Sequence, residues 1–213
     1  MTADVGTTWT KIRDEEGHNH ILPTRQILRE DWFFRKATGH LGQKRTELYC
    51  NELEALGHGA LKLIGDEDFT VVDIGSRDTK FVRFAGRKVR KLDWNQSCGA
   101  STGFTLELLL KYYELAPDKI KIPAASEGAW PVTCAVFGIE RIFDTLIQGG
   151  PLEEVLGQFV LGLAKNVYEF TMRPKLLYLS GGLCENPAFV QALSLFCKTV
   201  PLGRFVLLEG LSV

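Results

Sequence analysis

The sequence predicts an α/β protein. Short apolar runs bounded by turn residues alternate with segments whose apolar residues recur at a helical period. Three of the apolar runs end in loops of small residues, which is how buried strands commonly end. Hydrophobic residues make up 45% of the 213 residues, which is enough for the core of one large domain or of two small lobes.

The strands are predicted from short apolar runs. A buried strand covers residues 69–74 and ends at Gly75. Two further runs, 79–84 and 88–94, are expected to form a hairpin that turns at Ala85 and Gly86, and a fourth strand covers 175–179. Residues 115–127, rich in Pro and Ala, are expected to connect two lobes, 1–115 and 116–213.

The helices are predicted from apolar spacing and from their end signals. They cover residues 103–114, a segment from about 136 to the glycines at 149 and 150, 151–170 and 187–196. Pro151 is expected at the first position of its helix, and Asn186 is expected to cap the helix that Pro187 begins. The spacing of Phe104, Leu108 and Tyr112 indicates one face of the first helix, and we expect Tyr112 in the core.

The three loops of small residues have the composition of phosphate-binding loops. They are 4–11 (DVGTTWTK), 73–80 (DIGSRDTK) and 180–183 (SGGL). Glycine lets backbone N–H groups approach a polyphosphate, and Thr or Ser adds hydroxyl donors. Asp4 and Asp73 are placed to hold Mg²⁺ through water, and Lys11 and Lys80 to neutralise phosphate charge. Each loop alone is more often an ordinary strand end, but three in this order point to a nucleotide.

Two cysteines each precede a predicted helix in a glycine-containing segment. Cys98 lies in 95–107 (NQSCGASTGFTLE) and Cys134 in 131–138 (PVTCAVFG). A thiolate at a helix start faces the positive end of the macrodipole, which lowers its pKa and makes it a ready metal ligand. Two such thiolates are half the ligand set of an iron–sulfur cluster, so a symmetric dimer could share one cluster. The alternative is a pair of buried structural thiols.

The order of the three loops resembles the superfamily of actin, hexokinase and the heat-shock chaperones, and the cysteine segments narrow the match. The chain resembles the activator ATPases of 2-hydroxyacyl-CoA dehydratases and the ATPase subunits of benzoyl-CoA reductase. The matching positions are Asp73, Ile74, Gly75, Asp78 and Lys80; Asn95, Cys98, Ala100, Thr102, Gly103, Leu106 and Glu107; Cys134, Val136 and Phe137; Gly181, Gly182 and Asn186.

The resemblance implies a two-lobed, actin-like (ribonuclease H-like) ATPase fold with a shortened first lobe. ATP or ADP with Mg²⁺ would bind between the lobes, with Asp4, Asp73 and Asp78 as catalytic residues. The nucleotide-binding residues would be Gly6, Thr7, Thr8, Lys11, Gly75, Ser76, Arg77, Lys80, Gly103, Gly181, Gly182 and Asn186.

The resemblance also implies an electron-transfer function. One 4Fe–4S cluster would be held by Cys98 and Cys134 of both subunits of a homodimer, or of a heterodimer with a homologous subunit. The electron, donated by a ferredoxin or flavodoxin, would pass to a partner iron–sulfur dehydratase or reductase. ATP binding would move the helices that follow the cysteines, and hydrolysis would make the transfer directional.

The chain departs from the family pattern at several positions. Ser76 and Arg77 replace Gly-Gln in the second loop, and residues 52–60 resemble the family's E-I-T-x-H-x-x-G-A except for Leu56 in place of His. These departures leave two alternatives. One is a small-molecule kinase, for which Asp78 is the obvious general base. The other is a partner subunit that binds nucleotide without hydrolysing it.

Composition argues against several other classes of function. A net charge of −1 and the lack of a basic stripe argue against nucleic acid, and no apolar run is long enough to span a membrane. Because the start of the chain lacks a basic, apolar leader, we expect a cytoplasmic protein. Cys50, Cys184 and Cys197 are expected to be core or surface thiols, and the four histidines show no metal-binding spacing.

Overall fold

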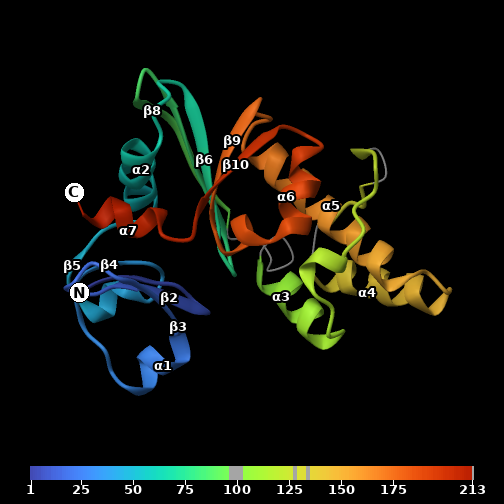
Figure 1. Ribbon diagram of the computed structural model, residues 1–213, viewed down its shortest axis with the longest axis horizontal. Helices are drawn as coiled ribbons and strands as arrows, with labels where there is room; N and C mark the ends of the chain where they lie inside the picture. Colours follow the sequence, from blue (N-terminus) through green and yellow to red (C-terminus); the bar gives the residue numbers. More distant parts are fainter. Residues whose placement is uncertain (96–102, 127–128, 133–134, 213) are drawn as a thin grey trace.

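The computed structural model describes residues 1–95, 103–126, 129–132 and 135–212. In these ranges the strands form two five-stranded sheets, ordered β3-β2-β1-β4-β5 and β10-β9-β6-β7-β8 (Figure 1). The first sheet consists of β1 (Thr2–Val5), β2 (Trp9–Arg13), β3 (Asn19–Pro23), β4 (Phe34–Thr38) and β5 (Thr46–Tyr49). The second consists of β6 (Phe69–Ile74), β7 (Thr79–Ala85), β8 (Lys88–Asn95), β9 (Leu176–Gly181) and β10 (Lys198–Gly203).

The first two of the three predicted phosphate loops, 4–11 and 73–80, contain the turns of two hairpins that have the same register. β1 pairs with β2 antiparallel, which sets Asp4 opposite Lys11. β6 pairs with β7 in the same way and sets Asp73 opposite Lys80. β9 runs parallel to β6, so the third loop leaves its sheet beside the second one.

The α-helices are α1 (Thr24–Arg29), α2 (Glu52–Leu63), α3 (Gly103–Tyr112), α4 (Ala135–Ile147), α5 (Leu152–Phe170), α6 (Pro187–Ser194) and α7 (Val206–Leu211). Two of the helices, α2 and α6, begin at an asparagine cap. The Asn51 side chain accepts a hydrogen bond from the backbone N–H of Leu53 at the start of α2. Asn186 does the same for Phe189 at the start of α6, where Pro187 occupies the first turn, as predicted.

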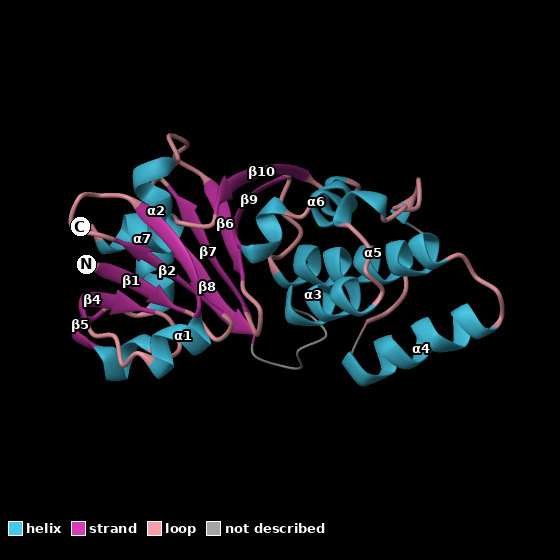
Figure 2. Cartoon of the chain, turned by 60° about the horizontal axis from the view of Figure 1, so that its bottom comes forward, coloured by secondary structure: helices cyan, strands magenta, loops and turns pink. Residues whose placement is uncertain are grey.

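β6, the central strand of the second sheet, is buried on both faces, which explains its mostly apolar sequence. On one face Val72, Ile74 and Phe81 pack in a core with residues of α5 and α6. On the other face Val71 and Phe84 pack with residues of α2 and α7. Figure 2 shows α3, α4 and α5 together on the side of the molecule away from the first sheet, and α4 packs on α5.

α2 and α7 join the two sheets through a close crossing. α2 contacts strands of the second sheet, α7 contacts strands of the first, and the two helices pack on each other. A Cβ on Gly59 would lie 1.9 Å from the carbonyl oxygen of Val206, and one on Gly210 would lie 1.9 Å from that of Ala55. Because no side chain fits at either point, the helix backbones touch directly.

Most predicted elements are confirmed, with small shifts at their ends. The strands at 69–74, 79–84 and 88–94 are present, and the last two form the expected hairpin. Pro151 is the N-cap of α5 rather than its first residue, because its backbone is still extended (ψ 132°). Ser180 and Gly181 belong to β9 rather than to a turn, since the parallel pairing with β6 extends to Gly181.

The expectation that Tyr112 lies in the core is wrong. Tyr112 is 69% exposed, and Phe104 and Leu108 share its exposed face of α3. Leu106 and Leu109 are the core residues of this helix instead. A period of 3.6 residues identifies faces but does not say which face is covered when several apolar residues surround the helix.

The strands of the second sheet come from both sides of the predicted boundary at residue 115, and the division into lobes at that residue stays a prediction. β6, β7 and β8 precede this residue, whereas β9 and β10 follow it. Among the helices of the described ranges, none has the length and apolar character to cross a membrane.

Candidate nucleotide site

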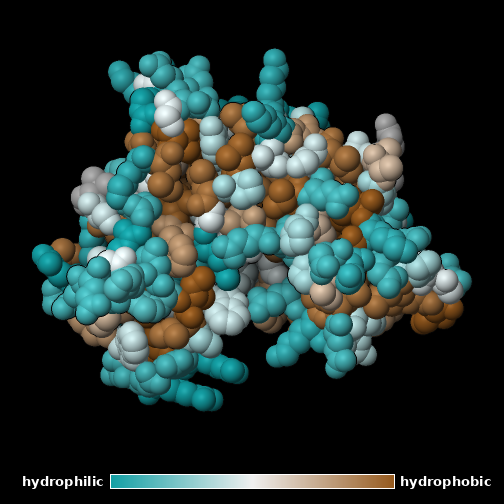
Figure 3. Space-filling view, viewed as in Figure 1, coloured by the Kyte–Doolittle hydropathy of each residue, from teal (hydrophilic) through white to brown (hydrophobic). Residues whose placement is uncertain are grey.

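The three loops of small residues converge on one cavity of about 310 Å³. The predicted site residues that line it are Asp4, Gly6, Thr7, Thr8, Lys11, Asp73, Gly75, Ser76, Arg77, Asp78, Lys80, Gly103, Gly182 and Asn186. Gly181 is not in the lining, and Cys98 and Cys134 lie outside the described residues. Figure 3 shows this face of the molecule hollowed between the half that carries the first sheet and the half that carries α3, α4 and α5.

The lining has a charged part and an apolar part. The two hairpins supply three aspartates and both lysines, α2 adds Glu52, and α3 adds Glu107. Leu106 and Leu110 of α3 together with Leu183 supply most of the apolar contact. A polar, hydrogen-bonding part beside an apolar part suits a ligand with a polyphosphate and a flat apolar ring.

The first hairpin is held tightly around its glycine. Lys11 Nζ lies 2.7 Å from Asp4 Oδ2. Burial lowers the pKa of Lys11, but the attraction of Asp4 and Asp73 outweighs it and leaves the pKa above its usual value. A Cβ on Gly6 would lie 2.8 Å from the carbonyl oxygen of Trp9, so only glycine fits there. The Thr24 hydroxyl donates to the Gly6 carbonyl at 2.9 Å and fixes the loop from α1.

The second hairpin carries a denser set of charges. Lys80 Nζ lies 2.6 Å from Glu52 Oε2 and 2.7 Å from Asp78 Oδ1. Lys80 is only 2% exposed. Burial would lower its pKa, but Asp73, Glu52 and Asp78 together raise it, so Lys80 is held as a cation. Asp73 accepts a hydrogen bond from the Ser180 hydroxyl at 2.8 Å, and burial raises the pKa of Asp73.

Asp78 is not a free base in this structure. Its Oδ1 binds Lys80, and its Oδ2 accepts a hydrogen bond from the Trp94 indole N–H at 2.7 Å. Trp94 also lies under the Lys80 ammonium, which is 5.3 Å from the ring centre. With both carboxylate oxygens engaged, Asp78 fits a positioning role at the second loop better than the base role that a kinase would need.

Glu52 is a site residue that the sequence analysis missed. It lies in the first turn of α2, is 6% exposed, and its Oε1 is buried with no hydrogen-bond partner among the described residues. Burial raises its pKa to about 7, although Lys80 opposes the rise. The family-like stretch 52–60 begins with this glutamate, so the sequence carries a signal for Glu52 beside the departure at Leu56.

Arg204 is a second missed residue of the lining. It follows β10 at the start of the segment that leads into α7. Its Nε is buried without a hydrogen-bond partner among the described residues, and its Nη1 lies 3.9 Å from Glu185. No local pattern indicates this position, because Arg204 lies outside the three loop segments along the chain.

α3 is bonded directly to the second loop. The backbone N–H of Gly103 donates to the carbonyl of Gly75, and that of Phe104 donates to the carbonyl of Ser76, both at 3.0 Å. A Cβ on Gly103 would approach the Gly75 oxygen to 3.2 Å, so glycine favours this contact. The helix that follows the Cys98 segment therefore begins on the loop that faces the charged part of the cavity.

Two contacts bridge the cavity between the first sheet and the rest of the site. Arg77 Nη1 lies 2.8 Å from His40 Nε2, in the loop after β4. The Trp9 indole N–H lies 3.4 Å from Glu107 of α3. Both are exposed, so they connect the two sides of the cavity without closing it.

The third loop approaches β6 closely. Gly181 has a φ of 88°, and a Cβ there would lie 2.4 Å from the carbonyl oxygen of Ile74. Asn186 lines the cavity and at the same time caps α6. This loop therefore brings the start of α6 to the cavity beside the second hairpin.

The described residues hold no group of three His, Cys, Asp or Glu side chains arranged to bind a metal ion by themselves. Mg²⁺ commonly takes one or two carboxylates and completes its shell with water and substrate phosphates, a demand that Asp4 and Asp73 meet. Cys184 and Cys197 are buried, and burial raises their pKa values to about 12 and about 11. They are core thiols, as predicted, and unsuited to act as thiolate ligands.

The chain is similar in sequence to proteins that activate CoA dehydratases. No family model matches the chain. The chain is 23% identical over 205 residues to the (R)-2-hydroxyglutaryl-CoA dehydratase activating ATPase of Acidaminococcus fermentans, covering 88% of this chain and 76% of that protein. It is 25% identical over 182 residues to the activator of lactoyl-CoA dehydratase of Anaerotignum propionicum, covering 81% and 70%. The resemblance to the activator ATPases is confirmed.

Solved structures confirm the predicted actin-like ATPase fold. The Clostridium difficile activator of 2-hydroxyisocaproyl-CoA dehydratase, solved with bound ADPNP, has a TM-score of 0.76 at 18% identity and matches 98% of this chain and 91% of its own. The Acidaminococcus fermentans (R)-2-hydroxyglutaryl-CoA dehydratase component A has a TM-score of 0.74 at 20% identity, covering 98% and 94%. The activators share their arrangement of elements with this chain more fully than the ethanolamine utilization protein EutJ of Carboxydothermus hydrogenoformans does (TM-score 0.57, 17% identity, covering 99% and 88%).

Proposed function

We propose that this chain is an ATP-dependent activator that delivers electrons to a 2-hydroxyacyl-CoA dehydratase or a benzoyl-CoA reductase-like enzyme. The observation that carries the proposal is the single cavity formed by the three loops, in a chain whose sequence relatives activate such dehydratases. The relative solved with ADPNP supports a nucleotide as the ligand.

The lining fits Mg²⁺ and a nucleoside triphosphate. Asp4 and Asp73 would hold Mg²⁺ through water, and backbone N–H groups at Gly6 and Gly75 would receive the phosphates. Leu106 and Leu183 would contact the base. Lys11 already neutralises Asp4, so phosphates entering the cavity would compete for this lysine.

The electron-transfer part of the proposal depends on the sequence motifs around Cys98 and Cys134. A 4Fe–4S cluster held by these residues would supply one-electron transfer. The bonds from Gly103 and Phe104 to the second loop support a link between nucleotide and cluster. Any displacement of that loop by phosphate would be passed to the start of α3, and so to the Cys98 segment that precedes it.

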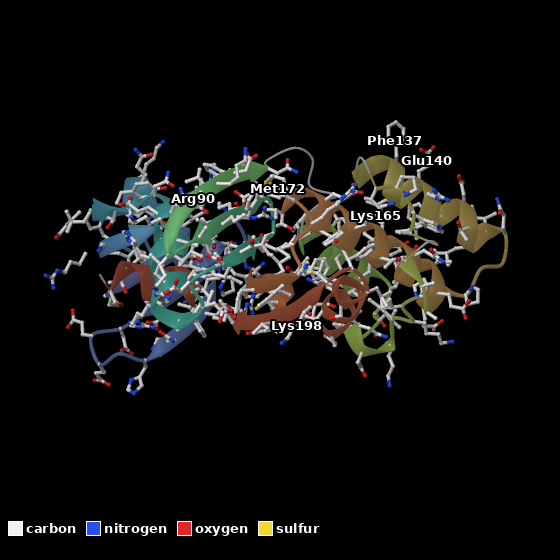
Figure 4. All side chains as sticks on the ribbon, turned by 90° about the horizontal axis from the view of Figure 1, so that it is seen from above. Arg90, Phe137, Glu140, Lys165, Met172 and Lys198 are labelled. Atoms are coloured by element: carbon white, nitrogen blue, oxygen red, sulfur yellow. The ribbon has the colours of Figure 1, made fainter. Side chains whose placement is uncertain are left out.

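The partners of the proposed function are a second copy or homologous subunit, a dehydratase or reductase, and a ferredoxin or flavodoxin donor. Exposed apolar side chains support protein contacts on the half of the molecule that carries α3 and α4. Phe104, Leu108 and Tyr112 of α3 are exposed, as are Phe137 and Ile147 of α4. Figure 4 shows Phe137 and Glu140 pointing away from the outer side of α4. The cytoplasmic location stays a prediction.

Iron and acid-labile sulfide in anaerobically purified protein test the proposal. About four of each per dimer are expected, and the Cys98→Ser variant should lose them. Cys50→Ser is the matched control, because Cys50 is a half-buried thiol outside the two motifs. A full iron content in Cys98→Ser, or no iron in the wild type after anaerobic reconstitution, would contradict the cluster.

Phosphate release from ATP separates this proposal from its two alternatives. Release with Mg²⁺, lost when the metal is chelated, is expected of the activator. Nucleotide binding without release would identify a non-hydrolysing partner subunit. A small-molecule kinase would need an acceptor-dependent reaction and a free base, and Asp78 has both oxygens engaged.

A further inference from the structure

We propose that Glu52 is the general base of ATP hydrolysis, taking the proton of the attacking water through its Oε1. This inference rests on the proposed function, since it names the group that would act on water in the same cavity. Glu52 belongs to α2 and to none of the three loops, and it lines the cavity.

The two oxygens of Glu52 have different surroundings. Oε2 lies 2.6 Å from Lys80 Nζ, which fixes the orientation of the carboxylate. Oε1 is buried and has no hydrogen-bond partner among the described residues, yet Glu52 lines the cavity. A buried carboxylate oxygen without a donor is costly, and a bound water would satisfy it. The geometry therefore provides a water-binding oxygen on a fixed side chain.

Each of the other three carboxylates from the two hairpins has at least one oxygen in a hydrogen bond or ion pair. Asp4 binds Lys11, and Asp73 accepts the hydrogen bond of Ser180. Asp78 is held on both oxygens by Lys80 and Trp94. Among the described residues, Glu52 Oε1 is the one carboxylate oxygen that is buried without a hydrogen-bond partner, which distinguishes Glu52 from the carboxylates that position other groups.

The charges around Glu52 suit proton transfer near neutral pH. The groups that face it are Lys80 and Asp78 of the second hairpin, Asp4 of β1 and Tyr49 of β5. Burial raises the pKa of Glu52 to about 7, while Lys80 prevents a larger rise. A base with a pKa near the working pH is unprotonated often enough to act and basic enough to take a proton.

The step balances without a further reactant. The water oxygen forms a bond to the γ-phosphorus as one water proton moves to Glu52 Oε1. The bond between the γ-phosphorus and the bridging oxygen breaks, and its electron pair leaves with ADP. Glu52 then releases the proton to solvent, and the site returns to its starting state.

The test compares Glu52→Gln with Glu54→Gln. Gln keeps the size of the side chain and an oxygen for Lys80 but cannot accept the proton. Glu54 lies in the same helical turn and is exposed, which makes it a matched control for the helix. In Glu52→Gln, kcat for phosphate release is expected to fall about 100-fold or more, with nucleotide affinity within about threefold of wild type. Glu54→Gln should retain both.

The pH profile gives a second readout. In the wild type, kcat should rise with pH through about 7, because only the ionised carboxylate acts as base. This rise should be absent from the residual activity of Glu52→Gln. Should Glu52→Gln fail to fold, Glu52→Asp keeps the charge and retracts the carboxylate, and its kcat should fall while affinity is retained.

Three results would overturn the inference. They are a kcat of Glu52→Gln within threefold of wild type, an unchanged pH profile, or an equal loss of affinity and kcat, which would indicate a structural role. A wild type that binds ATP but releases no phosphate would overturn hydrolysis itself, and with it this role. The wild-type assay therefore separates failure of the proposed function from failure of the inference.

Discussion

The two phosphate-loop hairpins have the same backbone plan but different surroundings. In each, an aspartate on the first strand lies opposite a lysine on the second, Asp4 with Lys11 and Asp73 with Lys80. Lys11 has one carboxylate partner, and its side chain is 13% exposed. Lys80 has two, from Asp78 and Glu52, and is 2% exposed. The added partner comes from α2, outside the hairpin.

This difference indicates how one motif can serve two purposes. A hairpin with a single ion pair can exchange its partner for a phosphate at modest cost. A hairpin whose lysine is buried among several carboxylates is fixed, and it holds other groups in place. We therefore expect Lys11 to be the lysine that pairs with phosphate, and Lys80 to hold the carboxylates of the site in place.

Removal of the lysine charge should show the largest contrast. Lys80→Met leaves Glu52 and Asp78 buried without their cation and should cost about 3–5 kcal/mol of unfolding free energy. Lys11→Met leaves one carboxylate, Asp4, without its cation rather than two, and should cost less, about 1–2 kcal/mol. Chemical denaturation of both variants at pH 7 measures the difference. Equal losses would show that the two hairpins do not differ in this respect.

For the loop glycines we expect the larger loss of stability in the first hairpin, the opposite of the order expected for the lysines. In Gly6→Ala the new Cβ meets the Trp9 carbonyl oxygen at 2.8 Å, a backbone atom, so we expect a loss of about 1–3 kcal/mol. In Gly75→Ala the nearest atoms are Asp78 Oδ1 at 3.2 Å and the Asp78 carbonyl oxygen at 3.4 Å, so a shift of only a few tenths of an ångström would accommodate the new Cβ. Thermal unfolding of the pair should place Gly75→Ala closer to wild type. The opposite order would mean that the first loop relaxes more readily than its contacts suggest.

The tryptophans beside the hairpins should give the smallest contrast. Trp94→Phe removes the hydrogen bond to Asp78 and should cost about 1.5 kcal/mol, since a bond to a buried charge is lost. Trp9→Phe removes an exposed bond to Glu107 at 3.4 Å and should change stability by no more than about 0.5 kcal/mol. Denaturation midpoints of the two variants, measured side by side, decide whether burial explains the difference.

The fold and the loops were predictable because their signals are local. Glycines after apolar runs, Asn186 before Pro187 and the alternation of strands and helices can each be recognised within a few residues. Arg204 was missed because tertiary packing, not a local pattern, brings it to the cavity, whereas Glu52 begins the family-like stretch 52–60 and only the packing of α2 shows that it reaches the cavity. The exposed face of α3 was misassigned for a related reason, since burial depends on which neighbours cover a helix.

The touching backbones of α2 and α7 also bear on how the chain folds. α7 follows every other described element, yet it packs on β1, β2 and β4, which come first. The first sheet therefore lacks its contacts with α7 until this last helix has formed. The ion pair between Arg13 of β2 and Glu209 of α7 also forms only then. Such contacts between distant parts of the sequence slow folding, so a ribosome-bound chain without α7 should remain accessible to proteases at its first sheet.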